Sequence, residues 1–429
     1  MQVLRAALDA ADPYRAVLRS LQGRDFSGVA GDIYVLGAGK AGAAMSRAAE
    51  EVLGERIAAG LVIVKDGHGG DAPLERIQVV EASHPVPDRR GVEATGRLLE
   101  MAALAGQNDL VLCLISGGGS ALMQAPAGGL TLEDIQQTTQ VLLRAGATIN
   151  ELNTVRKHLS RISGGRLART AAPARVLSLI LSDVTGSPLD VIASGPTAPD
   201  PTTFQGALDI LHHYGLSRAV SLSVLNMLEA GMRGDIEETP KPDDPLFARV
   251  ENVIIASNVL AVEAADAKAR ELDLNSVIMS TYVEGEASEV GLVLASVVKE
   301  IATYSRPIAK PGCVLFGGET TVTVRGEGVG GRNTELALSA ATGIKGLGPG
   351  VLVASLATDG GDGSSPSAGA IVDGTTIAEG EALGLDHHAA LANNDSYTYL
   401  AHVGDALMLG PTGTNVNDIM AVFVLSYEL

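Results

Sequence analysis

The sequence predicts an α/β protein made of two α/β domains with mainly parallel sheets. A length of 429 residues is more than one typical core holds, so about two domains are expected. Apolar residues make up 46% and charged residues 19%, which is typical of a packed α/β protein. The 51 glycines cluster after short apolar runs, as expected of strand-to-helix turns beside a ligand.

The first half of the chain alternates strands and helices in the pattern of βαβ units. Apolar runs predict strands that begin near residues 32, 59, 77, 109 and 175 and open into loops. Helical spacing is present over 1–21, 41–53, 91–105 and 130–146, and two or three more helices are expected in 149–169. Thr131 and Asp134 have the spacing of a capping box. A parallel sheet follows from this alternation.

A second α/β series follows a proline-rich, acidic segment at residues 233–249. We therefore predict domains over 1–245 and 246–429. A return of the last strand to the first sheet would move this boundary. The strand candidates of the second series are 251–258, 275–282, 312–324, 350–360, 405–415 and 419–429.

The charge balance favours small-molecule partners. With 31 basic and 50 acidic residues the net charge is −19, which argues against nucleic-acid or membrane partners. No signal-like or membrane-spanning apolar segment is expected. Cys113 and Cys313 lie within apolar runs, which predicts buried free thiols and fits a cytoplasmic protein. Whether the chain forms a homo-oligomer is left open.

The stretch IYVLGAGKAGAAM, residues 33–45, contains a Rossmann-like glycine fingerprint. Gly37, Gly39 and Gly42 spell G-x-G-x-x-G between a strand and a helix, where backbone amides can face a phosphate. Asp66 lies after these glycines, at about the distance where a Rossmann domain has an acid that binds the ribose of a nicotinamide cofactor. An NAD(P)-dependent reductase therefore stays a possible function. Lys40 instead favours phosphoryl transfer, because that chemistry needs positive charge near the moving group.

Polar loops follow several other predicted strands. In LISGGGSALM three glycines precede a helix, so their amides could bind a phosphate or carboxylate, although the spacing is not that of a Walker loop. An ordinary tight turn is the alternative for each loop. The strand-end loops are 37–42, 116–120, 182–187, 317–320, 358–364 and 411–415.

Acidic residues in these loops suit Mg²⁺, which takes hard oxygen ligands. An aspartate before glycine is also a common turn former, so a purely structural role is the alternative for each. The absence of Cys/His pairs argues against zinc. The metal candidates are Asp183, Glu319, Asp359 and Asp362.

Few basic residues lie near these loops. Arg332 lies among glycines in GEGVGGRNTE, where close backbone approach to an anion is plausible. The run 156–158, Arg-Lys-His, lies on a predicted helix and could equally be a solvated face. His84 precedes a proline at a strand end and could be hydrogen-bonded loop filler.

Nine strings together resemble the glycerate 2-kinase family, whose members carry a C-terminal MOFRL domain. The match extends from about residue 33 to 418 and covers VLGAGKAGAAM, ASHPVPD, LISGGGSALM, LNTVRKHLSRISGGRLA, SDVTGSPLDVIASGPT, FGGETTVTV, GGRNTELAL, ATDGGDGSSPSAGAIVD and GPTGTNVND. The resemblance implies ATP-dependent, Mg²⁺-assisted phosphorylation of D-glycerate at its 2-hydroxyl in an inter-domain cleft. It also places the MOFRL region at about 310–420. Members of this family have often been labelled hydroxypyruvate reductases.

The resemblance implies roles for individual residues. The catalytic roles that the resemblance implies apply most directly to Lys40 and Arg332, and then to Asp183 and Asp359. A reductase is the second interpretation and a nucleotide or sugar-acid sensor the third. The expected substrate- and nucleotide-binding residues are Gly37, Gly39, Gly42, His84, Ser116, Gly117, Gly118, Gly119, Ser120, Arg156, Lys157, Gly317, Gly318, Asn333, Thr412 and Asn415.

Overall fold

A computed structural model describes residues 1–70 and 73–425 as two compact units. The N-terminal unit comprises Pro13–Ser182 and Ser187–Ile255, and the C-terminal unit comprises Met1–Asp12, Asp183–Gly186 and Ala256–Leu429. The chain thus passes between units near residue 255 rather than 245, and it also does so near residue 12 and around 183–186. The predicted first helix is split at Pro13, and its first half belongs to the C-terminal unit.

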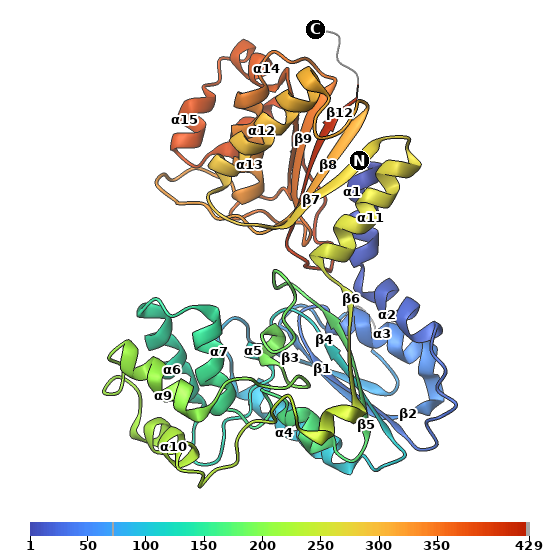
Figure 1. Ribbon diagram of the computed structural model, residues 1–429, viewed down its shortest axis with the longest axis vertical. Coiled ribbons are helices and arrows are strands. Elements are labelled where there is room, and N and C mark those ends of the chain that lie inside the picture. Colours follow the sequence, from blue (N-terminus) through green and yellow to red (C-terminus); the bar gives the residue numbers. More distant parts are fainter. Residues whose placement is uncertain (71–72, 426–429) are drawn as a thin grey trace. The chain divides into compact units, whose positions relative to one another are not determined.

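The N-terminal unit contains a six-stranded sheet and its flanking helices (Figure 1). Its strands are β1 Ile33–Ala38, β2 Ile57–Lys65, β3 Ile77–Ala82, β4 Leu110–Ile115, β5 Arg175–Leu181 and β6 Val250–Ala256. Its helices are α2 Pro13–Gln22, α3 Gly42–Leu53, α4 Arg89–Leu104, α5 Gly119–Leu122, α6 Leu132–Arg144, α7 Ile149–His158, α8 Arg166–Ala171, α9 Phe204–His213 and α10 Leu222–Met232, with 3-10 turns η1 Gly54–Arg56, η2 Ile192–Ser194 and η3 Pro245–Arg249.

The sheet of this unit confirms the predicted parallel arrangement. Its strand order is β3-β2-β1-β4-β5-β6, and the first five strands pair in parallel. All six residues of β4 are buried, as a continuous apolar run predicts for a central parallel strand. The assignment of residues 251–258 to the second series was wrong, because β6 lies beside β5 in this sheet.

Helices α6, α7, α9 and α10 form a helical lobe at one side of this unit (Figure 1). Leu142, Val155 and Phe204 are among the buried residues of its separate apolar core. The predicted capping box of Thr131 and Asp134 is present at α6, and Thr148 and Glu151 form another at α7. These caps satisfy backbone donors that a helix start leaves unpaired.

The C-terminal unit contains the second sheet. Its strands are β7 Asn275–Val283, β8 Gly312–Gly318, β9 Val351–Ala357, β10 Gly369–Asp373, β11 Ala406–Leu407 and β12 Asp418–Val424. Its helices are α1 Gln2–Ala11, α11 Asn258–Glu271, α12 Ala287–Tyr304, α13 Arg332–Ile344, α14 Thr376–Ala382, α15 His387–Ala392 and α16 Ser396–Val403.

The second sheet is mainly antiparallel, so the prediction of mainly parallel sheets was wrong for this unit. Its order is β11-β10-β9-β12-β8-β7, and of its neighbouring pairs only β7 with β8 is parallel. Strand β12 inserts between β8 and β9 and runs against both, so it does not return to the first sheet. Sequence analysis missed β10, and residues 426–429 of its last predicted strand lie outside the described residues.

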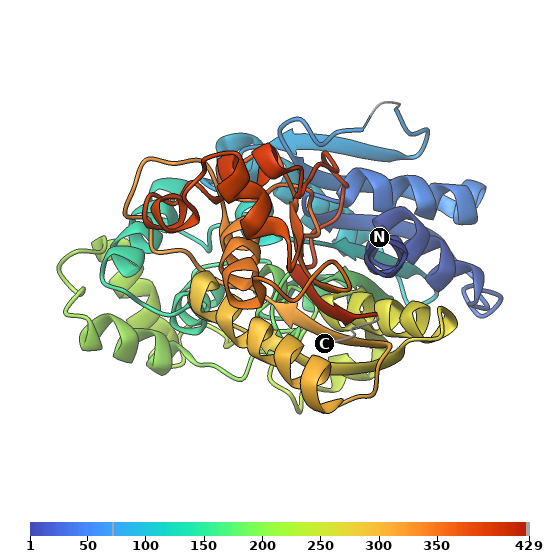
Figure 2. The ribbon, with the colours of Figure 1, turned by 90° about the horizontal axis from the view of Figure 1, so that it is seen from above.

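Helices α12 and α13 pack side by side against this sheet, as Figures 1 and 2 show. Their close approach requires Gly291, because a Cβ there would lie 2.4 Å from the carbonyl oxygen of Leu336. Leu294, Val298 and Leu336 belong to the buried core that the two helices share with the sheet. Backbone contact between helices therefore depends on the missing side chain.

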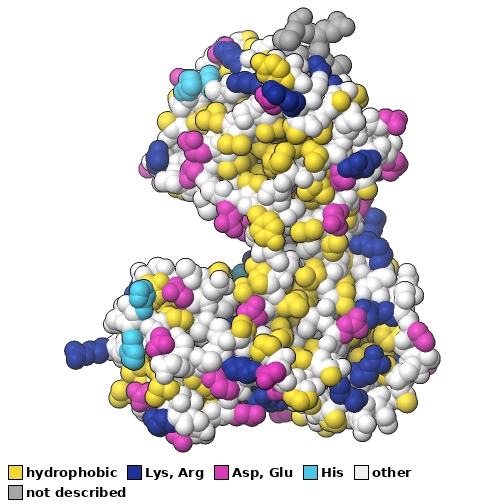
Figure 3. All heavy atoms as spheres, in the orientation of Figure 1, with side chains coloured by type: hydrophobic (Ala, Val, Ile, Leu, Met, Phe, Trp, Pro, Cys, Tyr) yellow, Lys and Arg dark blue, Asp and Glu magenta, His cyan; other side chains and the backbone are white. Residues whose placement is uncertain are grey.

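The two cysteines agree with the sequence prediction. Cys113 and Cys313 are buried free cysteines, as predicted. On the face drawn in Figure 3, Lys and Arg side chains are scattered among Asp and Glu rather than gathered in one patch. Across the described part of the chain, no helix combines the length and the apolar character needed to cross a bilayer.

We expect Gly291→Ala and Gly96→Ala to change stability in opposite directions. A Cβ at Gly291 meets the Leu336 carbonyl at 2.4 Å, whereas one at Gly96 in α4 meets nothing within 4 Å. Gly291→Ala should lower the free energy of unfolding by about 1–3 kcal/mol, and Gly96→Ala should raise it by up to about 1 kcal/mol. Urea denaturation of the full chain measures both, and a neutral Gly291→Ala would contradict the packing argument.

Candidate functional site

Two glycine-rich loops meet at the carboxyl ends of β1 and β4 in the N-terminal unit. The amide of Lys40 donates to the carbonyl oxygen of Gly117 at 2.9 Å. The amide of Ala41 donates to the hydroxyl oxygen of Ser116 at 3.1 Å. Both strands end at the same edge of a parallel sheet, which is where such sheets bind ligands.

The three glycines of the fingerprint are required by packing inside this structure. A Cβ at Gly37 would lie 2.0 Å from the carbonyl oxygen of Leu114, and one at Gly39 would lie 2.1 Å from the Ser116 hydroxyl. A Cβ at Gly42 would lie 2.7 Å from Val62 on β2. These glycines therefore hold the loops together, and the 1 % exposed Ser116 acts as a link between loops.

Lys40, His84 and Gly118 lie together beside these loops. A Cβ at Gly118 would lie 3.1 Å from the His84 ring and 3.6 Å from Cγ of Lys40. Burial, followed by the positive charge of Lys40, lowers the pKa of His84 below its usual value. Within the described residues no carboxylate pairs with the Lys40 ammonium, so a cation is left available to an anionic ligand.

The 116–120 loop also presents unused backbone donors. In the described parts of the chain, the amides of Gly117, Gly118 and Ser120 donate to no protein acceptor, whereas that of Gly119 donates to Ser116. The short helix α5 begins at Gly119, where a Cβ would crowd Ala193 at 2.8 Å. The three amides remain consistent with the predicted anion-binding loop.

A hydrogen-bonded chain fixes the last residue of this loop. The Ser120 hydroxyl is 2.9 Å from that of Ser194, which donates to the side-chain oxygen of Asn153 on α7 at 3.1 Å. Ala193 and Ser194 both have positive φ, at 49° and 60°. Backbone in this region is strained for residues with a Cβ and often marks functional loops. Sequence analysis missed Ser194 and Asn153, because no local pattern links them to residue 120.

Arg156 on α7 is a half-buried cation without a carboxylate partner among the described residues. Its Nε donates to the Thr139 hydroxyl on α6 at 3.3 Å. Burial lowers the pKa of the guanidinium to about 10. One helical turn before Thr139, Gln136 donates to the Pro87 carbonyl at 2.7 Å, which anchors the loop that carries His84. An unpaired, desolvated guanidinium is costly in isolation and favours an anionic ligand.

Lys157 and His158 are buried and paired inside the unit. They do not form the solvated helix face that was the alternative interpretation of the run 156–158. The Lys157 side chain is 2% exposed, and its ammonium lies 3.0 Å from Asp200 and 3.2 Å from Asp190. The His158 ring lies 3.2 Å from Glu238 and 2.8 Å from the Thr154 carbonyl oxygen. These contacts argue against the predicted role of Lys157 as a direct substrate ligand.

Asp66 is occupied by an exposed ion pair. Both of its carboxylate oxygens accept from Arg90, at 2.7 and 2.8 Å. The hydrogen bonds from Arg90 lower the pKa of Asp66. A carboxylate held in this way is a poor partner for a ribose hydroxyl, which weakens the nicotinamide interpretation.

Arg332 begins α13 in the C-terminal unit and is held by two carboxylates. Its Nε and Nη2 donate to Asp418 at 2.6 and 2.9 Å, and its Nη1 donates to Glu319 at 2.7 Å. Burial alone would lower the pKa of Arg332, but Asp418 raises it above the ordinary value. The fully buried Asp418 was missed in the sequence, although it is the first residue of the apolar strand β12.

Asp362 is used to begin helix α13. It accepts from the amides of Asn333 and Thr334 at 2.9 and 2.8 Å, and also from the Thr334 hydroxyl at 2.8 Å. Asn333 in turn accepts from the Ser355 hydroxyl at 2.6 Å. With 2% exposure and these bonds, Asp362 is poorly suited to the metal-ligand role predicted for it, and Asn333 to direct ligand binding.

Gly317 and Gly318 serve packing in this unit. A Cβ at Gly317 would lie 1.8 Å from the Asn258 side-chain oxygen, and one at Gly318 would lie 2.1 Å from the Val283 carbonyl oxygen. Gly318 also has φ of 150°, which favours glycine. Neither position needs a ligand to explain its glycine.

Asp359 is an exposed predicted carboxylate with no basic partner among the described residues, whereas the exposed Glu319 is paired with Arg332. The described bond of the Asp359 side chain is to the amide of Gly361 at 3.0 Å in its own turn. Thr412 lies beside it, donating from its amide to the Asp359 carbonyl at 3.2 Å. The side chain of Asn415 accepts from the amide of Asn417 at 3.1 Å. Asp183, half-buried after β5, has interaction partners of its own.

The predicted metal ligands do not form a preassembled centre. No group of three or more His, Cys, Asp or Glu side chains that could hold a metal ion exists among the described residues. Mg²⁺ often uses one or two carboxylates together with substrate phosphates, so an accessible Asp359 still fits a metal that arrives with a nucleotide.

Comparison with known proteins gives a consistent assignment across the chain. Residues 1–229 match a domain of unknown function, DUF4147, and residues 312–418 match the MOFRL family. A glycerate 2-kinase of Pyrococcus horikoshii is 44% identical, with 99% of this chain and 97% of that protein covered. A D-glycerate 2-kinase of Thermotoga maritima is 43% identical, covering 98% and 96%. The crystal structure of a Thermotoga maritima glycerate kinase aligns with TM-score 0.92 and 42% identity over 99% of this chain and 98% of that one.

We expect Lys40→Met to raise the pKa of His84. Lys40 is the second cause, after burial, of the lowered pKa of this ring. Removal of its charge should move the pKa up, but still below about 6.5 because burial remains. NMR titration of the histidine ring signals, assigned with a His84→Gln variant, measures the shift. Lys299→Met, on α12, is the control, and an unchanged His84 pKa in Lys40→Met would contradict the proposed proximity.

Asp362→Asn and Asp359→Asn should separate the structural from the accessible carboxylate. An amide at 362 places a donor where the Thr334 amide and hydroxyl now donate. We expect a loss of about 1–3 kcal/mol in the free energy of unfolding. Asp359→Asn should change it by less than about 0.5 kcal/mol. Urea denaturation compares the two, and equal losses would overturn the distinction.

Proposed function

The chain belongs to the glycerate 2-kinase family, and we propose that it phosphorylates D-glycerate at the 2-hydroxyl with ATP, giving 2-phosphoglycerate and ADP. The observation that carries this proposal is the Lys40 ammonium, unpaired within the described residues, beside His84 and a loop with unused backbone donors. Phosphoryl transfer is catalysed mainly by alignment and by neutralising charge on the moving group. A lysine and free amides supply both.

Each basic residue has a distinct proposed role. Lys40 would neutralise oxygens of the transferred phosphoryl group, and the amides of Gly117, Gly118 and Ser120 would bind the glycerate carboxylate. Arg156 would pair with a further anionic group of one substrate, which would satisfy its desolvated guanidinium. These roles go to basic residues that have no carboxylate partner among the described residues. Lys157, which the sequence also predicted as a ligand, is paired internally and receives no such role.

Arg332 is proposed to stabilise the transferred phosphoryl group. Asp418 and Glu319 fix the plane of its guanidinium through three hydrogen bonds of 2.6–2.9 Å. A preoriented cation does not need to reorganise while charge develops in the transition state. Asp418 is therefore a positioning residue in this proposal, not a catalytic one.

The reaction also needs a proton acceptor. The 2-hydroxyl oxygen of glycerate forms a bond to the γ-phosphorus as the bond from that phosphorus to the β,γ-bridging oxygen breaks and ADP leaves. Asp359 or Asp183 would accept the hydroxyl proton, since the family resemblance implies catalytic roles for both and Asp359 is exposed. Asp362 and Asp418 are less suited, because they are committed to internal hydrogen bonds.

Mg²⁺ is proposed as the accompanying metal. The accessible carboxylate of Asp359 fits it, with Glu319 or Asp183 as further candidates and substrate phosphates as the remaining ligands. When bound, the ion would neutralise phosphate charge. The occupied Asp66 disfavours the NAD(P)-dependent hydroxypyruvate reductase, which nicotinamide binding by calorimetry would test directly.

ADP release from ATP and Mg²⁺, with and without D-glycerate, tests the activity. We expect ADP only when glycerate is present, and ³¹P NMR should locate the phosphate on the 2-hydroxyl. A folded protein that releases no ADP with glycerate but oxidises NADH with hydroxypyruvate would overturn the proposal in favour of the reductase.

Lys40→Met should lower kcat by at least about 10²-fold, equivalent to about 2.7 kcal/mol of barrier. The physical reason is that methionine keeps an unbranched side chain of nearly the same length but removes the charge that balances the moving phosphoryl group. Steady-state kinetics measures the change, with the exposed Lys299→Met as the matched control. Unchanged turnover by a folded Lys40→Met would exclude Lys40 from the transition state.

A further inference from the structure

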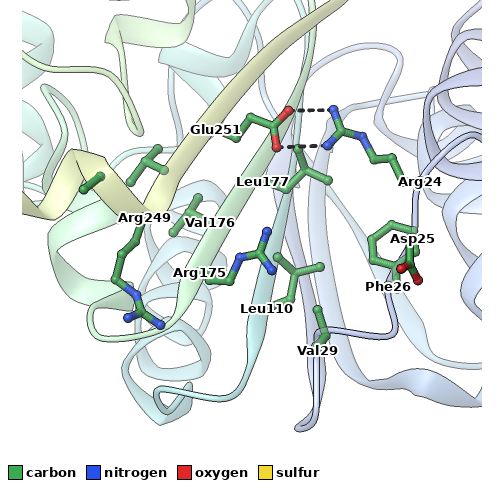
Figure 4. A pocket seen from close by; sticks show the side chains of 12 residues that line it. Arg24, Asp25, Phe26, Val29, Leu110, Arg175, Val176, Leu177, Arg249 and Glu251 are labelled. Atoms are coloured by element: carbon green, nitrogen blue, oxygen red, sulfur yellow. Dashed lines mark hydrogen bonds and ion pairs between the residues drawn. The ribbon is translucent and has the colours of Figure 1, made fainter.

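A pocket with a volume of about 310 Å³ lies in the N-terminal unit (Figure 4). Leu110, Arg175 and Val250, the first residues of β4, β5 and β6, contribute to its lining. These are the amino ends of the strands, whereas the glycine loops follow the carboxyl ends of β1 and β4. The pocket is therefore separate from the candidate active site of the same unit.

Arg175 supplies an exposed positive charge to this pocket. No hydrogen bond or ion pair engages its guanidinium within the part of the chain that is described. Figure 4 shows this side chain between Leu110 and the pair formed by Arg24 and Glu251. That pair is bidentate, at 2.9 and 2.8 Å, so Arg24 occupies both oxygens of Glu251. The hydrogen bond from Arg24, and to a lesser extent the charge of Arg175, lowers the pKa of Glu251.

The other charged groups of the pocket leave an excess of positive charge. Arg249 donates to the Gln107 carbonyl at 3.0 Å and has no carboxylate partner among the described residues. Asp25 accepts from the amide and hydroxyl of Ser27, both at 2.8 Å. The lining thus carries three arginines against two carboxylates, in a chain whose net charge is −19. Such local charge attracts small anions.

The remaining walls are apolar. Val29, Leu110, Val176 and Leu177 are at most 8% exposed and form part of the lining, together with the ring of Phe26. Ligand pockets typically combine apolar walls with a few placed polar groups and have volumes of about 300–1,000 Å³. This pocket has both properties at the lower end of that range.

We propose that this pocket is a binding site for a small organic anion, a carboxylate or phosphate monoester with an apolar or aromatic body. Arg175 pairs with the anionic group, and the apolar walls and Phe26 contact the body. A guanidinium suits either anion because its planar donors match two acceptor oxygens. The site is independent of the phosphoryl-transfer chemistry proposed for the glycine loops.

Isothermal titration calorimetry of the full chain with phenyl phosphate and with benzoate tests the site. We expect at least one of these probes to bind the wild-type chain, and the comparison between them identifies the preferred anion. Benzyl alcohol, which keeps the ring without the charge, should bind at least tenfold more weakly than the better anion.

Arg175→Gln should weaken binding of the better probe by at least tenfold, about 1.4 kcal/mol. Arg218→Gln, an exposed arginine outside the pocket, is the matched control and should leave binding unchanged. Circular dichroism verifies that each variant is folded, and Leu177→Trp, which fills the pocket, provides a second loss-of-binding variant. Saturating D-glycerate should not displace the probe.

Three results would overturn the proposal. The first is that neither probe binds the wild-type chain, and the second is that Arg175→Gln and Leu177→Trp both retain wild-type affinity. Loss of binding in Lys40→Met with full retention in Arg175→Gln would instead place the probe at the glycine loops. Failure of kinase activity alone would leave this binding result intact, so the two proposals are tested separately.

Discussion

The close approach of β1 and β4 at their carboxyl ends is the constraint on which the candidate site depends. Gly37 permits it against the Leu114 carbonyl, and the Ser116 hydroxyl then links the two loops through the Ala41 amide. Because the backbone of Lys40 is hydrogen-bonded to Gly117, this contact fixes the point from which the Lys40 side chain extends. The fingerprint glycines are thus needed for the close packing of the two loops. They affect a ligand only indirectly, through the positions of these loops.

Some acidic residues are used in internal hydrogen bonds, whereas others stay accessible to a ligand. Asp362 caps the start of α13, and Asp418 fixes the plane of Arg332, so two buried carboxylates organise one helix end. Asp359 remains exposed on its turn. Buried carboxylates must be paired or hydrogen-bonded because desolvation is costly, whereas an exposed one keeps its capacity for a cation or a proton.

Basic side chains without a carboxylate partner are the features that point to anionic ligands in so acidic a chain. Lys40, Arg156 and Arg175 have no carboxylate partner in the described residues, although the chain contains 50 acidic side chains. Nearby Lys157 shows the contrasting arrangement, in which Asp190 and Asp200 enclose the ammonium. Exposed cations such as Arg175 are easily solvated, so its lack of a partner gains meaning only from the pocket that it lines. Burial desolvates Arg156, and an anionic ligand would offset that cost.

The sequence alone determined the family resemblance, the parallel first sheet, the capping box at Thr131 and the buried thiols, because these depend on local order and periodicity. It could not determine strand pairing between distant segments, so β6 was misassigned and the antiparallel second sheet was missed. Nor could it separate Asp359 from Asp362, or Arg156 from Lys157, whose sequence settings are alike. Only tertiary structure brings Asp200 to Lys157 and Asp418 to Arg332, because burial and pairing arise from contacts between residues far apart in the chain.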